Sequence, residues 1–231
     1  MFVKIDNNPD NKLIKTYYKF NVFVKEITNL IDAGCNVNCI TSDGQSFISI
    51  VMKDYIKSSD PATKNKSLVV FKKMMEHDVF LEIYDKNGRT PLFSTIGHDD
   101  DYMLDEIIKC GVNLDVIDNS KMTTLLWACK GDNMSLVKKL IDSGADISIL
   151  DNVNNNFMHL LAAHQSKESI IKECMPIFNQ NLNLLTMKNY RGVTPLIILE
   201  KQGLIKEYKA LKKLVKPIEK DKESVRDFVN S

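Results

Sequence analysis

At residues 85–92 the chain reads Asp85-Lys86-Asn87-Gly88-Arg89-Thr90-Pro91-Leu92, and at residues 118–125 it reads Asp118-Asn119-Ser120-Lys121-Met122-Thr123-Thr124-Leu125. Each octet leads into an apolar segment that closes on a glycine, Gly111 in the first case and Gly144 in the second. The two aspartates, the Thr90–Thr123 pair and the two closing glycines are each 33 residues apart. Because three separate landmarks share one offset, the sequence predicts a repeat architecture.

The same pattern returns near the end of the chain as Gly192-Val193-Thr194-Pro195-Leu196, and the second unit closes on Ser143-Gly144-Ala145-Asp146. These residues resemble the ankyrin repeat family, whose units carry G-x-T-P-L at the turn and x-G-A-D at the exit. The resemblance implies an all-α fold, a solenoid of about six helix-turn-helix units joined by β-turn fingers. One such unit is too small to bury its own apolar side chains, so neighbouring units must cover them.

We expect one ankyrin-repeat domain over residues 1–231. The boundaries of its parts follow the 33-residue period, except where a repeat is longer than 33 residues. Gly44 and Gly88 are 44 residues apart, and the surplus of 11 residues is expected as a polar, Pro-containing loop between two helices. The predicted parts are a capping repeat at 1–40, a repeat with an insertion near 57–66 at 41–84, regular repeats at 85–117 and 118–150, a degenerate repeat at 151–187, a C-terminal capping repeat at 188–215 and a tail at 216–231.

Within a unit, each position of the motif has a physical role. The Thr of T-P-L is expected to cap the first helix through its hydroxyl, and Pro suits the first helical position because it has no amide to leave unpaired. The Leu that follows, for example Leu125, is expected in the core. In the degenerate repeat, Asn154 is expected to keep the left-handed turn, and His159 occupies a position where the family commonly has a histidine bonded to neighbouring backbone.

The composition argues against some classes of function but identifies none. The net charge is +1, from 31 basic and 30 acidic residues, so no global field attracts nucleic acid or an anionic membrane. Five cysteines without a C-x-x-C pair fit a reducing compartment, and no apolar run of about 18 residues occurs. We therefore expect a cytoplasmic protein, of the producing cell or of an infected host cell.

The chain contains no nucleotide-binding, zinc-protease or hydrolase motif. Three groups of residues remain as candidate metal or redox sites. The groups are His98 with the acidic run 99–101, His159 with His164, and Cys35 with Cys39. Consecutive residues seldom converge on one ion, and nothing near the cysteines in sequence lowers a thiol pKa. We expect no catalytic residue, no metal and no cofactor. The run at 99–101 is instead expected to lie at a helix start, where carboxylates complement the helix dipole.

The resemblance implies a binding surface on a concave face, formed by the turn fingers and the exposed side of each first helix. Trp, Tyr and Arg supply much of the energy in protein interfaces, and the chain has one tryptophan. Plainer alternatives remain open: Trp127 as core, Tyr84 and Tyr190 as turn packing, and Arg89 as a solvated charge. An exposed apolar ridge is also expected from Ile117, Met122, Leu150 and Met187. The predicted partner-binding residues are Tyr84, Lys86, Arg89, Asn119, Met122, Trp127, Lys130, Asn152, Asn155 and Tyr190.

The leading functional hypothesis is a non-catalytic interaction module that binds, and inhibits or recruits, a protein partner. With 28 lysines and 21 asparagines against three arginines, the composition is typical of AT-rich genomes. Small ankyrin-only proteins of this kind are similar to those of viruses, phages and intracellular bacteria, which implies a host or defence factor as partner. Two alternatives stay open: a nucleic-acid-associated regulator that uses the lysine-rich C-terminal helix (201–222), and a metal-dependent enzyme on a repeat scaffold.

Overall fold

The computed structural model describes residues 12–19, 24–96, 102–163, 175–177, 179–204, 206 and 208–215. The chain divides into two compact units, Met1–Asn119 (unit 1) and Ser120–Ser231 (unit 2). The described residues are helical and contain no strand beyond an isolated antiparallel bridge between Ile40 and Ser46. The predicted all-α class is therefore confirmed, and the assignment of repeat boundaries stays a prediction.

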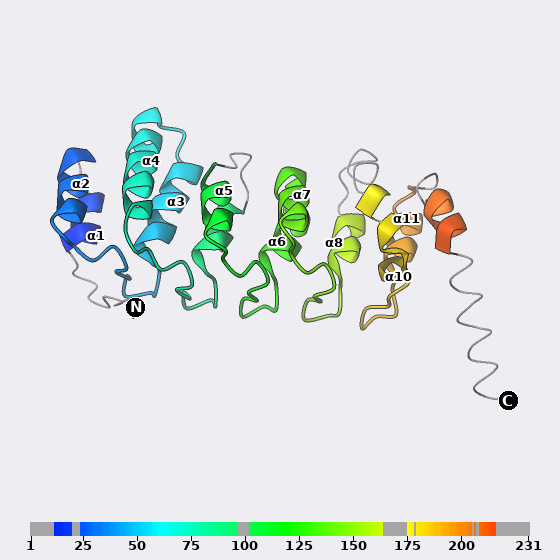
Figure 1. Ribbon diagram of the computed structural model, residues 1–231. Coiled ribbons are helices and arrows are strands. Elements are labelled where there is room, and N and C mark those ends of the chain that lie inside the picture. The colour runs from blue at the N-terminus through cyan, green and yellow to red at the C-terminus, as the bar shows by residue number, and fades with distance from the viewer. Residues whose placement is uncertain are drawn as a thin grey trace. The chain divides into compact units, whose positions relative to one another are not determined.

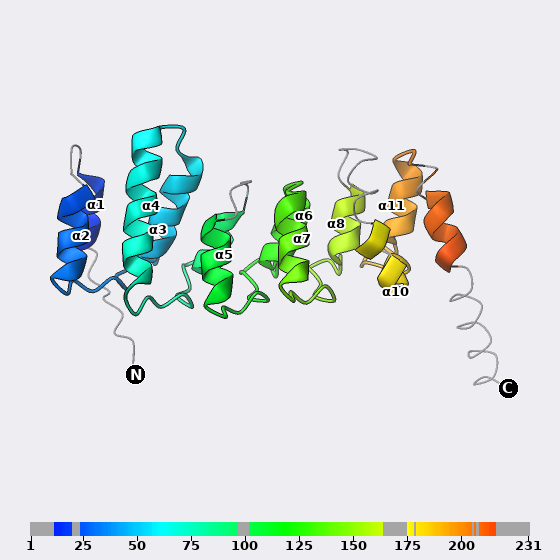
Figure 2. The same cartoon turned by 45° about the horizontal axis from the view of Figure 1, so that its top comes forward.

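Unit 1 contains helices in pairs that follow one another along the chain (Figure 1). Within it, α3 packs against both α4 and η1, while α2 packs against α4 (Figure 2). The first helix of one pair thus contacts the first helix of the next, and the same holds for the second helices. The elements are α1 (Lys12–Tyr18), α2 (Val24–Asp32), α3 (Phe47–Lys57), α4 (Pro61–Met75), η1 (Pro91–Thr95) and α5 (Tyr102–Lys109).

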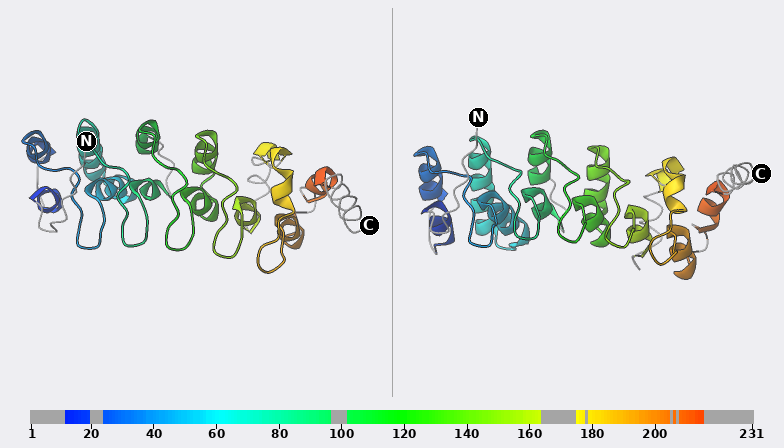
Figure 3. Two further views of the ribbon diagram at one scale, coloured as in Figure 1. Left: turned by 60° about the horizontal axis from the view of Figure 1, so that its bottom comes forward. Right: turned by 90° about the horizontal axis from the view of Figure 1, so that it is seen from below.

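Unit 2 repeats this organisation with shorter helices. Here α6 packs against α7 and α8, and α8 packs in turn against α10 and α11. Narrow loops, the fingers, connect each pair to the next, and within each unit they extend from the helices to one side (Figure 3). The elements are α6 (Thr124–Lys130), α7 (Met134–Asp142), α8 (Phe157–Ala163), α10 (Leu182–Leu185) and α11 (Pro195–Lys201).

Three of the fingers are held by the first side chain of the turn. Asp85 Oδ1 accepts hydrogen bonds from the backbone N–H groups of Asn87 (2.8 Å) and Arg89 (3.0 Å). Asp151 Oδ1 accepts the equivalent pair from residues 153 and 155, and Asn189 Oδ1 from residues 191 and 193. Asn154 has φ +62°, in the left-handed region that Gly88 occupies at the same place in its finger. The prediction for Asn154 is confirmed.

The predicted threonine caps are present in two of three cases. Thr123 Oγ1 accepts from Leu126 N–H, and Thr194 Oγ1 accepts from Ile197 N–H, each at 3.2 Å. The prediction is wrong for Thr90, whose side chain makes no cap bond. There the first helix is the 3₁₀ helix η1, and the Phe93 N–H bonds to the Thr90 carbonyl at 3.1 Å instead. The tighter turn takes the amide that the hydroxyl would have capped.

The surplus residues of the second repeat are helical, which corrects the predicted loop at 57–66. Only residues 58–60 connect α3 and α4. Asp60 accepts from the N–H groups of Ala62 and Thr63, and Pro61 occupies the first turn, so both support an early start of α4. The extra length therefore extends the two helices to 11 and 15 residues. The polar side chains suggested a loop because the first turns of α4 are largely exposed.

At two of the three helix starts that lack the proline of the motif, a large aromatic side chain fills the core. Phe47 and Phe157 stand at the first position of α3 and α8, where T-P-L would have Pro, and both are fully buried. Tyr17 packs edge-on against Phe47 at 5.4 Å between ring centroids and bonds to Ser67 Oγ at 2.9 Å. The burial of these rings thus contributes stability to the two repeats whose turn motif is incomplete.

His159 is a structural residue in unit 2, as predicted. It is 1% exposed, its Nε2 lies 3.1 Å from the Val193 carbonyl oxygen, and its Nδ1 lies 2.8 Å from Asn156 Oδ1. Asn156 in turn donates to the Leu184 carbonyl at 2.9 Å. The pair therefore connects the start of α8 to α10 and to the finger that precedes α11.

Burial lowers the pKa of His159 below its ordinary value, although the Val193 carbonyl opposes the shift. The unfolded chain then takes up a proton on this histidine at a higher pH than the folded chain. We expect the stability contributed by neutral His159 to be complete above the unfolded pKa of about 6.5 and to fall as pH drops below it. Urea denaturation at pH 7.5 and pH 5.5 measures this: the loss should be smaller in His159→Gln, and an equal loss in both proteins would contradict it.

Candidate binding surfaces

The side chains that the sequence singled out lie in two clusters, one in each unit. Both clusters use the finger face, defined here as the fingers together with the first helices, α3 and η1 in unit 1 and α6, α8 and α11 in unit 2. His98, His164 and the acidic run 99–101 lie outside the described residues, as do residues 216–222 of the lysine-rich segment and the tail.

Two tyrosines on this face are exposed. Tyr84 precedes its finger and is 54% exposed, and Tyr190 lies in a finger and is 72% exposed. The backbone of Tyr190 is fixed, because its N–H donates to the Val153 carbonyl at 3.0 Å. The side chains are therefore not used in turn packing, and both offer large amphipathic surfaces for contact.

Arg89 forms an ion pair between neighbouring fingers, so the interpretation as a solvated charge is wrong. Its Nε and Nη2 donate to Asp118 Oδ2 at 3.1 and 2.9 Å. The Asp118 side chain is 1% exposed and the Arg89 side chain 35%. Asn119 continues the connection, with its Nδ2 donating to the Lys86 carbonyl at 3.0 Å. Arg89 and Asn119 thus hold two fingers together, whereas the Lys86 side chain is exposed.

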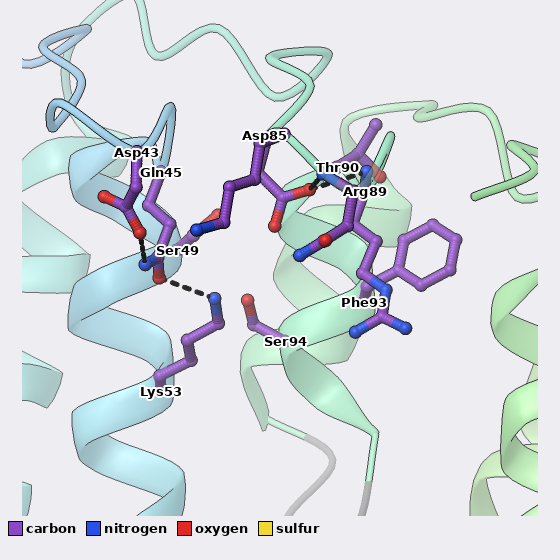
Figure 4. A pocket seen from close by; sticks show the side chains of 11 residues that line it. Asp43, Gln45, Ser49, Lys53, Asp85, Arg89, Thr90, Phe93 and Ser94 are labelled. Atoms are coloured by element: carbon purple, nitrogen blue, oxygen red, sulfur yellow. Dashed lines mark hydrogen bonds between the residues drawn. The ribbon is translucent and has the colours of Figure 1, made fainter. Parts of the chain in front are cut away.

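A polar pocket of about 130 Å³ lies beside Arg89 in unit 1. Figure 4 shows its walls: α3 supplies Ser49 and Lys53, and η1 supplies Phe93 and Ser94. The fingers contribute the remaining lining residues, Asp43, Gln45, Asp85, Lys86, Asn87, Arg89 and Thr90. Lys53 donates to Gln45 Oε1 at 2.8 Å across the pocket.

A wider groove of about 530 Å³ lies in unit 2 between α6 and α8. Trp127 is half-buried in its wall, with the Lys130 ammonium 4.8 Å from the ring centroid. Trp127 is therefore a partly exposed groove residue and not a fully buried core residue. The other lining residues are Ser120, Met122, Asp151, Asn152, Asn155, Leu160 and Ala163.

The remaining predicted groove residues differ in exposure. Met122 is only 6% exposed, so the expected exposed ridge is wrong at this position: the side chain borders the groove but belongs mainly to the core. Asn152 is exposed. Asn155 is half-buried and tied on both sides, because it donates to Asp151 and accepts from Asn189 Nδ2 at 2.8 Å. It supports the finger more than it offers a free contact.

Sequence reasoning missed Lys53 and Ser94. Both lie on first helices outside the finger motif, and the period says nothing about which helical side chains meet beneath neighbouring fingers. For Lys53 the spacing could have been used: it lies four residues after Ser49, so the two side chains share one face of α3.

Within the described part of the chain, no group of three or more His, Cys, Asp or Glu side chains is placed to hold a metal ion. Cys39 is buried and Cys35 half-buried, and neither forms a disulfide. None of the described helices is long and apolar enough to cross a membrane.

Comparison with known proteins agrees with this geometry. Residues 61–151 match the family model for ankyrin repeats in three copies. Among solved structures, the fold is similar to the ankyrin repeat domain of Bcl-3, a member of the IκB protein family, with a TM-score of 0.59 at 16% sequence identity. The match covers 80% of this chain and 74% of that domain's chain. No curated protein matches the sequence. Residues 61–151 are therefore ankyrin repeats, and the chain has the fold of an ankyrin repeat domain.

Proposed function

We propose that the protein is a non-catalytic binding module that holds a protein partner on its finger face. Ankyrin repeats are in general protein–protein interaction modules. The observation that carries the proposal is the groove of unit 2, where the only tryptophan of the chain is half-exposed beside Lys130. Interface energy concentrates in such aromatic side chains, which bury a large area with few rotatable bonds.

The exposed Tyr84 and Tyr190 support the same surface in their respective units. Exposed aromatic side chains in fingers that are rigidly hydrogen-bonded cost little entropy when a partner covers them. We propose further that binding inhibits or recruits a host or defence factor in the cytoplasm. The composition favours this origin, since it is similar to that of AT-rich viral and intracellular-bacterial genomes.

The test uses a partner captured by affinity purification and then titrated as a pure protein. We expect Trp127→Ala to weaken binding at least about tenfold, because truncating a central interface aromatic removes more than about 1.4 kcal/mol. Lys130→Ala, in the groove, should weaken binding by a smaller factor. Lys138→Ala provides the matched control, because Lys138 is an exposed lysine on the second helix α7.

Unchanged affinity in Trp127→Ala, with circular dichroism showing an intact fold, would place the partner elsewhere on the molecule. Equal losses in Lys130→Ala and Lys138→Ala would indicate general charge attraction in place of the groove. Retention on DNA that falls steeply with salt would instead favour the nucleic-acid alternative.

A further inference from the structure

The polar pocket of unit 1 contains a lysine ammonium that is not in an ion pair with any described residue. Lys53 is half-buried, and its ammonium donates to one neutral acceptor, Gln45 Oε1. Among the described residues it forms an ion pair with no carboxylate. An ammonium has three donors, so two of them remain for a ligand. Burial lowers the pKa of Lys53, and the charge of Asp85 only partly opposes this.

The two carboxylates that line the pocket accept hydrogen bonds within the fingers, Asp43 on both oxygens and Asp85 on one. Asp43 accepts from the Thr41 hydroxyl and from Gln45 Nε2, and these bonds lower its pKa. Asp85 accepts two backbone N–H groups of its own finger on one oxygen. Arg89 is paired with Asp118. Among the lining side chains that are at least half-buried, Lys53 is the one whose charged donors are not used in an ion pair with a described residue.

A serine hydroxyl in the pocket wall adds a second donor. Ser94 is 6% exposed, and its side chain makes no hydrogen bond to any described residue. Figure 4 shows the Ser94 hydroxyl and the Lys53 ammonium directed into the same space below the Asp85 carboxylate. A hydroxyl at the pocket wall offers one O–H donor to an acceptor on a ligand.

The size of the pocket limits the ligand. Its volume of about 130 Å³ is well below the roughly 300–1,000 Å³ of pockets that hold cofactors or drug-sized molecules. It accommodates the head group of one side chain. The position between two fingers and two first helices puts its mouth on the finger face.

We propose that this pocket receives the carboxylate of an aspartate or glutamate side chain of the protein partner. One carboxylate oxygen accepts from the Lys53 ammonium and the other from the Ser94 hydroxyl. Such charge-assisted bonds are about twice as strong as neutral ones. The inference rests on the proposed function for the identity of the occupant, and it adds the chemistry of one anchor and its place in unit 1.

The test on the intact protein needs no partner. The probes are N-acetyl-aspartate N-methylamide and its neutral asparagine counterpart, titrated while the amide resonances of residues 45, 49, 53 and 94 are followed by NMR. We expect saturable shifts with the acidic probe and at least about tenfold weaker binding of the neutral one. Lys53→Met should lose at least tenfold and Ser94→Ala a smaller factor, while Lys57→Met, on an exposed lysine one turn further along α3, should bind as the parent does.

Equal binding of the two probes, or no shift at these residues, would overturn the inference. Tighter binding of inorganic phosphate than of the acidic probe would overturn it in favour of a phosphate group. Titration of the captured partner separates the two proposals. Loss of partner binding in Trp127→Ala but not in Lys53→Met refutes the carboxylate anchor and leaves the binding function. If the acidic probe binds but no protein partner is captured, the carboxylate site stands and the proposed function is refuted.

Discussion

Replacing Leu125 with Ala is expected to lower the free energy of unfolding of unit 2 by about 2–5 kcal/mol. Leu125 is 2% exposed and lies in the first turn of α6, which packs against α7 and α8. Truncation removes buried apolar area and leaves a cavity that rigid helices fill poorly. Because units in a repeat array are stable mainly through their neighbours, a cavity at such an interface should weaken the whole of unit 2.

Urea denaturation measures this effect, and the single tryptophan makes the readout local. Trp127 lies on α6 with Leu125, so its fluorescence reports on unit 2. Leu214→Ala is the matched control in the same unit, because Leu214 is 42% exposed and its loss should cost less than about 0.5 kcal/mol. Equal urea midpoints for Leu125→Ala and the parent protein would contradict the burial of this residue.

Replacing Arg89 with Met is expected to cost unit 1 about 2–4 kcal/mol. The substitution keeps an apolar stem but removes the guanidinium that pairs with Asp118, and it leaves a buried carboxylate without its cation. A fully buried pair loses about 3–5 kcal/mol when one partner is removed. The expected range is lower because the Arg89 side chain keeps 35% exposure.

Circular dichroism during urea denaturation follows this variant, since Trp127 does not report on unit 1. Arg191→Met is the control, because Arg191 is an exposed arginine in another finger. A second variant distinguishes the ion pair from lost packing: adding Asp118→Asn to Arg89→Met should recover part of the stability, because the unpaired charge is removed. A double variant less stable than the single one would refute the electrostatic explanation.

The sequence was sufficient for the fold because the repeat signal is local. Turn residues at fixed spacing, such as Gly88 and Asn154, report directly on backbone conformations that few residues adopt. Helix caps follow from the same short-range chemistry, and two of the three predicted threonine caps are present. The exception, Thr90, precedes a 3₁₀ helix, which no nearby residue in the motif signals.

The errors concern contacts between segments that are distant in sequence. Arg89 looked like a free finger charge because its partner, Asp118, belongs to the next finger. Met122 looked exposed because it sits in a turn, but its side chain turns into the core. The polar stretch 57–66 looked like a loop because its composition is the same for a loop and for an exposed first helical turn. Lys53 and Ser94 line the same pocket only because α3 packs against η1.

Hydrogen exchange of the protein with and without its captured partner tests the central claim most directly. We expect slowed exchange at the fingers, residues 41–46, 85–90, 118–123, 151–156 and 189–194, and at the first helices α3, η1, α6, α8 and α11. The second helices α4, α5 and α7 should exchange as in the free protein. Protection confined to α4, α5 and α7, with the fingers unchanged, would show that the partner binds the opposite side and would contradict the proposal.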